Sequence, residues 1–178
     1  MLLTYLDKKP QLHNSVFIAS GAKIIGDVTI SAESNIWYNT IVRGDVAPIC
    51  IGSNTNIQDG SVIHTSRFNG PCRIGDRVTV GHMCLLHACN LHDDAFVGMY
   101  STLMDNSVVE SFGFLAANSL LTPGKIVKSY ELWAGSPAKF IRKLNDNELF
   151  LIQDTPPHYI MLARNHAKST KVEFQQNN

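Results

Sequence analysis

The chain has 178 residues, enough for one domain with a continuous core and a short appendage. Its 15 basic and 15 acidic residues cancel, so there is no surplus of positive charge to bind nucleic acid. The first residues hold too short an apolar stretch for a signal peptide, and no window approaches the roughly 18 apolar residues of a membrane span. We therefore predict a cytoplasmic protein that binds neither nucleic acid nor membrane.

An aliphatic residue recurs every six positions through most of the chain. Neither a helix, with about 3.6 residues per turn, nor an alternating strand, with a period of about two, produces this spacing. A hexapeptide repeat is the signature of a parallel β-helix, and here it covers roughly residues 10–127. The repeat is irregular at three places: a slip at Pro48, an interruption from Thr65 to Arg73 and one five-residue step after Leu86. The repeated positions are Ile18, Ile24, Ile30, Ile36, Val42, Ile51, Ile57, Ile63, Ile74, Val80, Leu86, Leu91, Val97, Leu103, Val109, Leu115 and Leu121.

Each hexapeptide is expected to make one short strand and one bend, so that three of them close a triangular coil. Coils stack about 4.8 Å apart through backbone hydrogen bonds, with the aliphatic residues pointing inward. The known hexapeptide proteins that this repeat resembles coil left-handed. The predicted fold is therefore an all-β solenoid, a left-handed parallel β-helix of hexapeptide repeats with a C-terminal α-helix. We place the β-helix domain at residues 1–127, and an exit segment with a C-terminal helical region packed on the prism at residues 128–178.

The region after the repeat carries helix signals. Asn145 and Glu148 are spaced as a capping box at the start of a helix. Pro156 and Pro157 are expected to end that helix, and a second helical segment is expected from Tyr159 to roughly residue 168. The candidate buried positions are Leu149, Phe150, Ile152, Ile160, Leu162 and Ala163.

Four cysteines occur without a CxxC pair: Cys50, Cys72, Cys84 and Cys89. We interpret them as small buried apolar residues rather than metal ligands. Cys72 lies in the interruption of the repeat, where a loop could expose it.

Two of the seven histidines occupy equivalent places in successive coils. His64 follows Ile63 and His87 follows Leu86, and with three hexapeptides per coil Leu86 lies one coil above Ile63. The two imidazoles should therefore lie on one wall of the prism, about one strand spacing apart. Both point outward, because residues next to an inward position face the other way. Two such rings can bind one metal ion.

His82 lies two residues after Val80, on the preceding wall, and is poorly placed to join the other two histidines. It can join the pair of a neighbouring prism packed alongside. Ligands from two subunits imply a closed ring, and a homotrimer suits a triangular prism. Three imidazoles with an open fourth position form the ligand set of a catalytic zinc, with iron or cobalt as alternatives. The competing interpretation is that all three histidines are ordinary surface residues.

With these histidines, the segments 43–45, 56–64 and 81–87 resemble the γ-class carbonic anhydrase family, and the similarity covers nearly the whole chain. The resemblance implies a lyase in which a metal-activated water attacks CO₂. It also implies that Gln58 hydrogen-bonds the hydroxide or the substrate, that Arg43 and Asp45 join an ion-pair network between subunits, and that Asp59 orients a ligand.

Tyr159 resembles a tyrosine that approaches the site in some members of this family. Other interpretations stay open: Asp45 and Asp59 could be turn residues, Arg43 could pair across subunits without a catalytic part, and Tyr159 could serve packing alone.

The chain departs from the family's founding type, which carries glutamates for proton transfer after its Arg-Gly-Asp and beyond its first histidine. Here residues 46–49 and 65–67 hold no carboxylate. Hydration must release a proton in every cycle, so this departure puts fast turnover in doubt. The conceivable substitutes are His13, His92, Asp93 and Asp94.

Three other functions remain open at this point. The same metal hydroxide could hydrolyse an acyl-CoA thioester. The chain could be a hexapeptide acyltransferase, although that class uses one basic histidine and needs no trio. It could also be a catalytically weak, metal-stabilised trimer, since a fold alone does not choose among chemistries.

Overall fold

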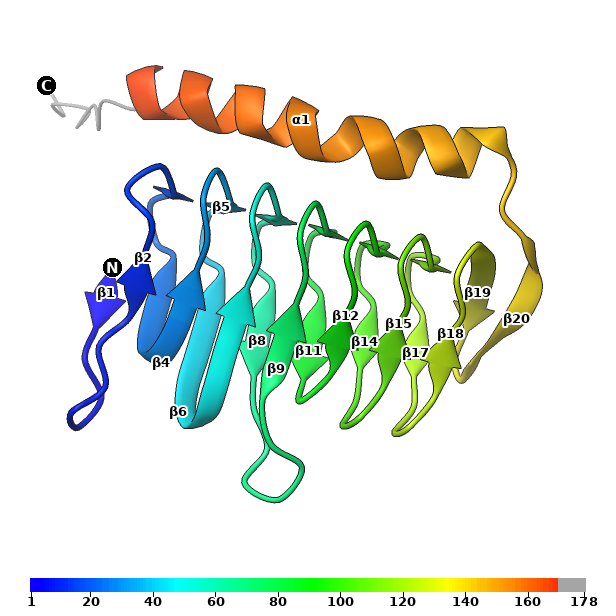
Figure 1. Cartoon of the computed structure of the whole chain (residues 1–178), viewed down its shortest axis with the longest axis horizontal. Helices are drawn as coiled ribbons and strands as arrows, with labels where there is room; N and C mark the ends of the chain where they lie inside the picture. Colours follow the sequence, from blue (N-terminus) through cyan, green and yellow to red (C-terminus); the bar gives the residue numbers. More distant parts are fainter. Residues whose placement is uncertain (170–178) are drawn as a thin grey trace, which may run out of the picture.

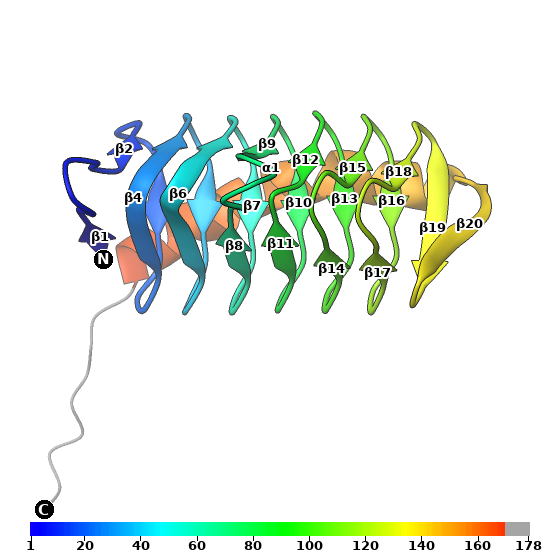
Figure 2. The ribbon, with the colours of Figure 1, turned by 90° about the horizontal axis from the view of Figure 1, so that it is seen from below.

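The computed structural model describes residues 1–169 as a left-handed parallel β-helix of about seven coils, with one helix, α1 (Asp146–Ser169), lying along it (Figure 1). Residues 170–178, the end of the predicted C-terminal region, lie outside the described residues. Figure 2 shows α1 running nearly the full length of the stack of coils. The fold predicted from the repeat is confirmed.

The strands form three walls of a triangular prism. We call them the helix-covered wall, the histidine wall and the third wall. The helix-covered wall consists of β3 (Phe17–Ile18), β5 (Asn35–Ile36), β7 (Asn56–Ile57), β10 (Thr79–Val80), β13 (Phe96–Val97), β16 (Phe114–Leu115), β19 (Glu131–Gly135) and β20 (Ala138–Lys143). The histidine wall consists of β8 (Val62–His64), β11 (Leu85–His87), β14 (Thr102–Leu103) and β17 (Leu120–Leu121). The third wall consists of β9 (Cys72–Ile74), β12 (Asn90–Leu91), β15 (Val108–Val109) and β18 (Ile126–Val127).

Two long strands bend around the edge between the histidine wall and the third wall. They are β4 (Lys23–Ile30) and β6 (Ile41–Ile51), and β6 pairs with both β8 and β9. At the N-terminal end, β1 (Leu2–Leu3) and β2 (Gln11–Leu12) pair with β4. Successive coils pair in parallel, whereas β20 turns back antiparallel on β19 and covers its outer edge.

The repeated aliphatic residues fill the prism. From Ile24 to Leu121 every one of them is at most 3% exposed, and only Ile18, in the first coil, is partly buried. The backbone pairs Val42 with Ile63 and Ile63 with Leu86, so equivalent residues stack along the axis. Each inward position fixes its neighbour as outward, and this alternation positions the histidines.

Helix α1 begins as predicted but does not break at the prolines. Glu148 Oε2 accepts from the Asn145 backbone N–H at 2.8 Å, and Asn145 Oδ1 accepts from the Glu148 N–H at 3.2 Å, which confirms the capping box. The expected break at Pro156 and Pro157 is wrong, because one helix runs through both. Both prolines lack the N–H of a helical hydrogen bond, but Pro156 is buried with Ile152 against the prism, and this packing holds the helix together.

Some predicted burial is also wrong. Phe150 is 61% exposed, whereas Ile152 and Ala163 are buried and Leu149, Ile160 and Leu162 are half-buried.

The cysteines divide differently from the prediction. Cys72 is fully buried in β9 because its side chain points inward, while Cys50 points outward from β6 and is exposed. Cys84 and Cys89 are buried as predicted.

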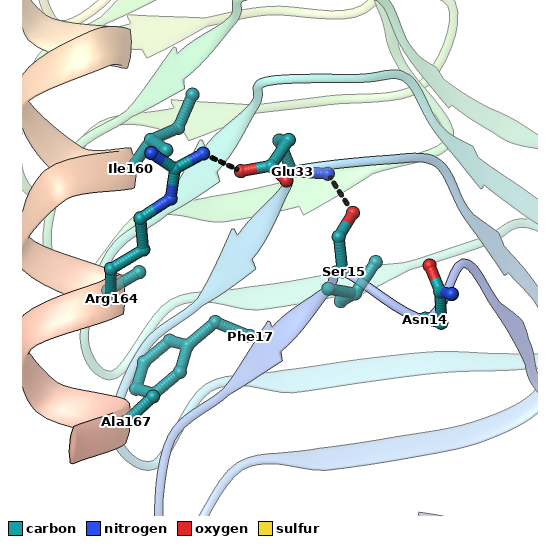
Figure 3. A pocket seen from close by; sticks show the side chains of 9 residues that line it. Asn14, Ser15, Phe17, Glu33, Ile160, Arg164 and Ala167 are labelled. Carbon is teal, nitrogen blue, oxygen red and sulfur yellow. Dashed lines mark hydrogen bonds and ion pairs between the residues drawn. The ribbon is translucent and has the colours of Figure 1, made fainter.

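A small cavity of about 230 Å³ lies between α1 and the first coil (Figure 3). Arg164 Nη2 lies 2.8 Å from Glu33 Oε2 there, and the Glu33 backbone N–H donates to Ser15 Oγ. These contacts fasten the end of α1 to the prism. Among the described residues, α1 is not long and apolar enough to cross a membrane.

Candidate functional site

His64 and His87 lie directly opposite each other on the histidine wall. They end strands β8 and β11, and the backbone register pairs them. Their ring centroids are 5.3 Å apart, and the ring planes are tilted by 55°. Both side chains are partly exposed, at 19% and 29%. The repeat therefore brings two imidazoles to one spot on the outer surface, as the sequence predicts.

His82 lies in the turn between β10 and β11, at the edge where the helix-covered wall meets the histidine wall. Its Nδ1 lies 2.9 Å from Asp59 Oδ2, on the turn of the preceding coil. Within residues 1–169 of a single chain, no three side chains of the metal-binding types come together. The three histidines thus occupy two separate places in one subunit.

Asp45 and Arg43 lie beside His64. Asp45 Oδ1 is 2.9 Å from His64 Nε2, and its other oxygen accepts from the Arg43 guanidinium. Burial alone would raise the pKa of Asp45, but hydrogen bonds from His64 and Arg43 outweigh it and lower that pKa. The carboxylate therefore stays ionised next to the histidine, in contact with Arg43 of its own chain.

Asp105 holds His87 in a similar way, and sequence reasoning missed it. Its Oδ1 lies 2.5 Å from His87 Nδ1, and its Oδ2 accepts from Asn69 Nδ2 at 2.7 Å. Burial opposes ionisation of Asp105, but the hydrogen bonds of Asn69 and His87 lower its pKa to about 2. The signal was present in the repeat, because Asp105 directly follows Met104, the position one coil above His87.

The carboxylates make the histidines suitable donors for a metal. Asp105 hydrogen-bonds the Nδ1 of His87, and Asp59 lies 2.9 Å from the Nδ1 of His82, which leaves Nε2 of both histidines for coordination. His64 differs, since Asp45 lies against its Nε2 and the remaining nitrogen is Nδ1. Neutral imidazoles with carboxylate partners are the usual donor set for zinc and other divalent transition metals, so the residues fit such an ion.

A groove of about 390 Å³ begins at His82 and runs between the helix-covered wall and α1. Gln58 and Tyr159 line its polar end with His82, and Gln58 is only 5% exposed, with its Nε2 donating to Asn56 Oδ1 at 2.9 Å. Burial, and then the charge of Asp59, raise the pKa of Tyr159. The structure therefore brings Gln58, Tyr159 and Asp59 to His82.

The substitutes considered for the missing glutamates lie elsewhere. His13 Nδ1 lies 2.8 Å from Ser15 Oγ in the first coil. Asp93 and Asp94 face Arg77, and His92 is exposed beside them at the end of β12. None of these side chains lines the groove at His82.

Known proteins similar to this chain share both sequence and fold. Gamma carbonic anhydrase 2, mitochondrial, of Arabidopsis thaliana is 45% identical over 98% of this chain, which spans only 65% of that relative. The carbonic anhydrase of Geobacillus kaustophilus is 43% identical, with 84% of this chain and 81% of the relative aligned. A solved hexapeptide transferase family protein from Anaplasma phagocytophilum superposes with a TM-score of 0.90 at 50% identity, over 93% of this chain and 98% of the other.

The chain matches no family model. The carbonic anhydrase relatives nevertheless align with most of its length at more than 40% identity. The solved structure shares the same coiled architecture. The chain therefore belongs to the γ-class carbonic anhydrase family of hexapeptide-repeat β-helix proteins.

Proposed function

We propose that this protein is a metal-dependent carbonic anhydrase that acts as a homotrimer, with zinc shared between subunits and iron or cobalt as alternatives. His64 and His87 of one subunit and His82 of the next hold the ion. The observation that carries this proposal is the register of the histidine wall, which places two imidazoles 5.3 Å apart while His82 faces outward at the wall's opposite edge.

The outer surface of the histidine wall supports a trimer. One row of outward-facing residues stacks along this wall, from β6 through β8, β11 and β14 to β17. Four residues of this row are aliphatic: Ile41, Val62, Leu85 and Leu120. Near His82, Met83, Met99 and Tyr100 are each about half exposed or more. An apolar strip of this kind, beside an incomplete ligand set, is typical of a surface that another subunit covers.

When bound, a divalent ion would supply a nucleophilic hydroxide at neutral pH, because it lowers the pKa of coordinated water from ~15.7 to about 7. Asp105 hydrogen-bonds Nδ1 of His87, and Asp59 lies against Nδ1 of His82, so each ring can present its Nε2 to the ion. Gln58 offers an amide that both donates and accepts without titrating, and so it can orient CO₂ or bicarbonate. Asp45 and Arg43 hold His64 in place.

The test combines metal analysis with stopped-flow CO₂ hydration on purified protein. We expect about one ion per subunit, because three equivalent interfaces form in a trimer. His64→Ala and His82→Ala should each lose both the ion and the activity. His92→Ala, an exposed histidine away from the site, is the matched control and should keep both. Metal-loaded protein that hydrates CO₂ no faster than buffer contradicts the assignment.

A second candidate function is hydrolysis or transfer of an acyl group carried by a thioester. The apolar part of the groove beside His82 favours it, and the similar Anaplasma protein is named a hexapeptide transferase. A thioesterase assay on the same preparation separates the two functions. The cytoplasmic location stays a prediction, since the Arabidopsis relatives are named mitochondrial.

A further inference from the structure

The loop between β8 and β9 displays an exposed aromatic ring next to the histidine pair. Phe68 is 86% exposed, and the loop projects from the prism on the side opposite α1 (Figure 1). The loop is held in place: Ser66 and Gly70 exchange backbone hydrogen bonds, and Asn69 donates to Asp105, which also contacts His87. A fixed loop loses little conformational freedom on binding, so Phe68 is prepared for a partner surface.

The groove beside His82 offers an apolar site for such a ring. Beyond its polar end it is lined by Phe96, Val97, Met99, Phe114 and Leu151. The rings of Phe96 and Phe114 stack with centroids 4.4 Å apart and form its floor. Aromatic side chains pack favourably against such rings, edge to face or offset.

The shared ion brings the loop and the groove together. Phe68 is four residues beyond His64, and a chain segment of that length spans at most about 14 Å. The groove begins at His82, the ligand that the next subunit contributes. If the two edges meet at one ion, the loop of the subunit that holds His64 is within reach of the mouth of the neighbour's groove. Within one subunit, the loop projects on the side of the prism opposite α1 (Figure 1), whereas the groove is lined in part by Leu151 and Tyr159 of α1.

We propose that Phe68 of each subunit inserts into the apolar groove of its neighbour and closes the site over His82. This inference rests on the proposed trimeric metal site. An inserted phenyl ring occupies the apolar part of the groove, and the space that remains lies between His82, Gln58 and Tyr159. That space suits a small substrate such as CO₂ and excludes a long acyl chain. The loop, which holds no carboxylate, thus serves as a cover.

The test places the photo-crosslinker p-benzoylphenylalanine at position 68 of the full chain and maps crosslinks by mass spectrometry. We expect crosslinks between two chains, to peptides that contain Met99, Phe114 or Leu151. The same crosslinker at Leu6, which is 82% exposed in the N-terminal region, is the control and should not label the groove. A trimer that carries metal but crosslinks at position 68 only within one chain, or to another surface, overturns the inference and leaves the proposed function standing. A monomer without metal overturns both.

A second measurement uses Phe68→Ala, which should fold because the side chain is exposed. The emptied groove should bind an apolar dye such as 1-anilinonaphthalene-8-sulfonate about 2- to 12-fold more tightly than the wild-type trimer does, because the dye no longer has to displace the ring. Metal content, measured separately, should be unchanged. Equal dye binding by the two proteins contradicts insertion of the ring.

Discussion

Asp105 and His87 are joined across neighbouring coils by a contact of 2.5 Å between a carboxylate oxygen and Nδ1. The second oxygen of the same carboxylate accepts from Asn69, so one side chain positions both a candidate ligand and the loop beside it. Outer partners of metal-binding histidines commonly change metal affinity by 10–100-fold. The pair is therefore a sensitive place to test the metal site without removing a ligand.

Replacing Asp105 by Ala should weaken zinc binding by roughly 10–100-fold, because His87 loses the acceptor that fixes its tautomer. Competition with a chromophoric chelator measures the affinity. Asp93→Ala removes an exposed carboxylate that faces Arg77 from the turn after β12; this variant is the matched control and should bind zinc like the wild type. Unchanged affinity in Asp105→Ala would show that this carboxylate does not support a ligand.

Mixing two inactive variants tests whether the site is shared. His64→Ala and His82→Ala subunits should be unfolded together in equal amounts and refolded. In a closed ring, a site is complete only where a subunit with intact His64 meets a neighbour with intact His82, so about a quarter of the sites should be recovered. Metal content and CO₂ hydration would report the recovery. If neither returns in trimers shown to be mixed, the three histidines do not come from two subunits.

Gly81 should not tolerate a side chain. A Cβ there would lie 2.6 Å from the backbone nitrogen of Met99 in the next coil, which cannot move away. Gly81→Ala should destabilise the protein by about 1–3 kcal/mol, in the range of other overpacking substitutions. Denaturant unfolding gives the stability. Gly98→Ala makes a similar clash with Ala117 and should lower the free energy of unfolding by about as much. Only Gly81→Ala should also weaken metal binding, because Gly81 adjoins His82.

The cysteines should differ sharply in reactivity. Burial raises the pKa of Cys84 to about 11, so at pH 8 almost none of it is thiolate, the form that reacts. Cys72 and Cys89 are fully buried, and only Cys50 is exposed. A thiol reagent at pH 8 should label Cys50 rapidly and the other three only after unfolding. Peptide mapping of the labelled protein checks this, and early labelling of Cys72 would show that the third wall opens.

The repeat alone predicts the coils because a six-residue period imposes inward and outward positions that no local preference overrides. It also predicts the opposition of His64 and His87, which depends only on counting coils. The prolines in α1 were misread, because the packing of Ile152 and Pro156 on the prism outweighs their local effect. Asp105 was missed because its role depends on a side-chain contact to the coil below, and Cys72 because β9 begins inside the apparent loop.

The loop from Thr65 to Pro71 lengthens one coil without disturbing the stack, since β8 and β9 both keep their partners in β6. Insertions or deletions at this bend would leave the two imidazoles opposite each other. A single added residue between Ile74 and Leu86 would instead turn His87 toward the interior and bring a leucine to the surface. The opposition of the two histidines therefore depends on the number of residues from β9 to β11 and not on the length of the bend between β8 and β9.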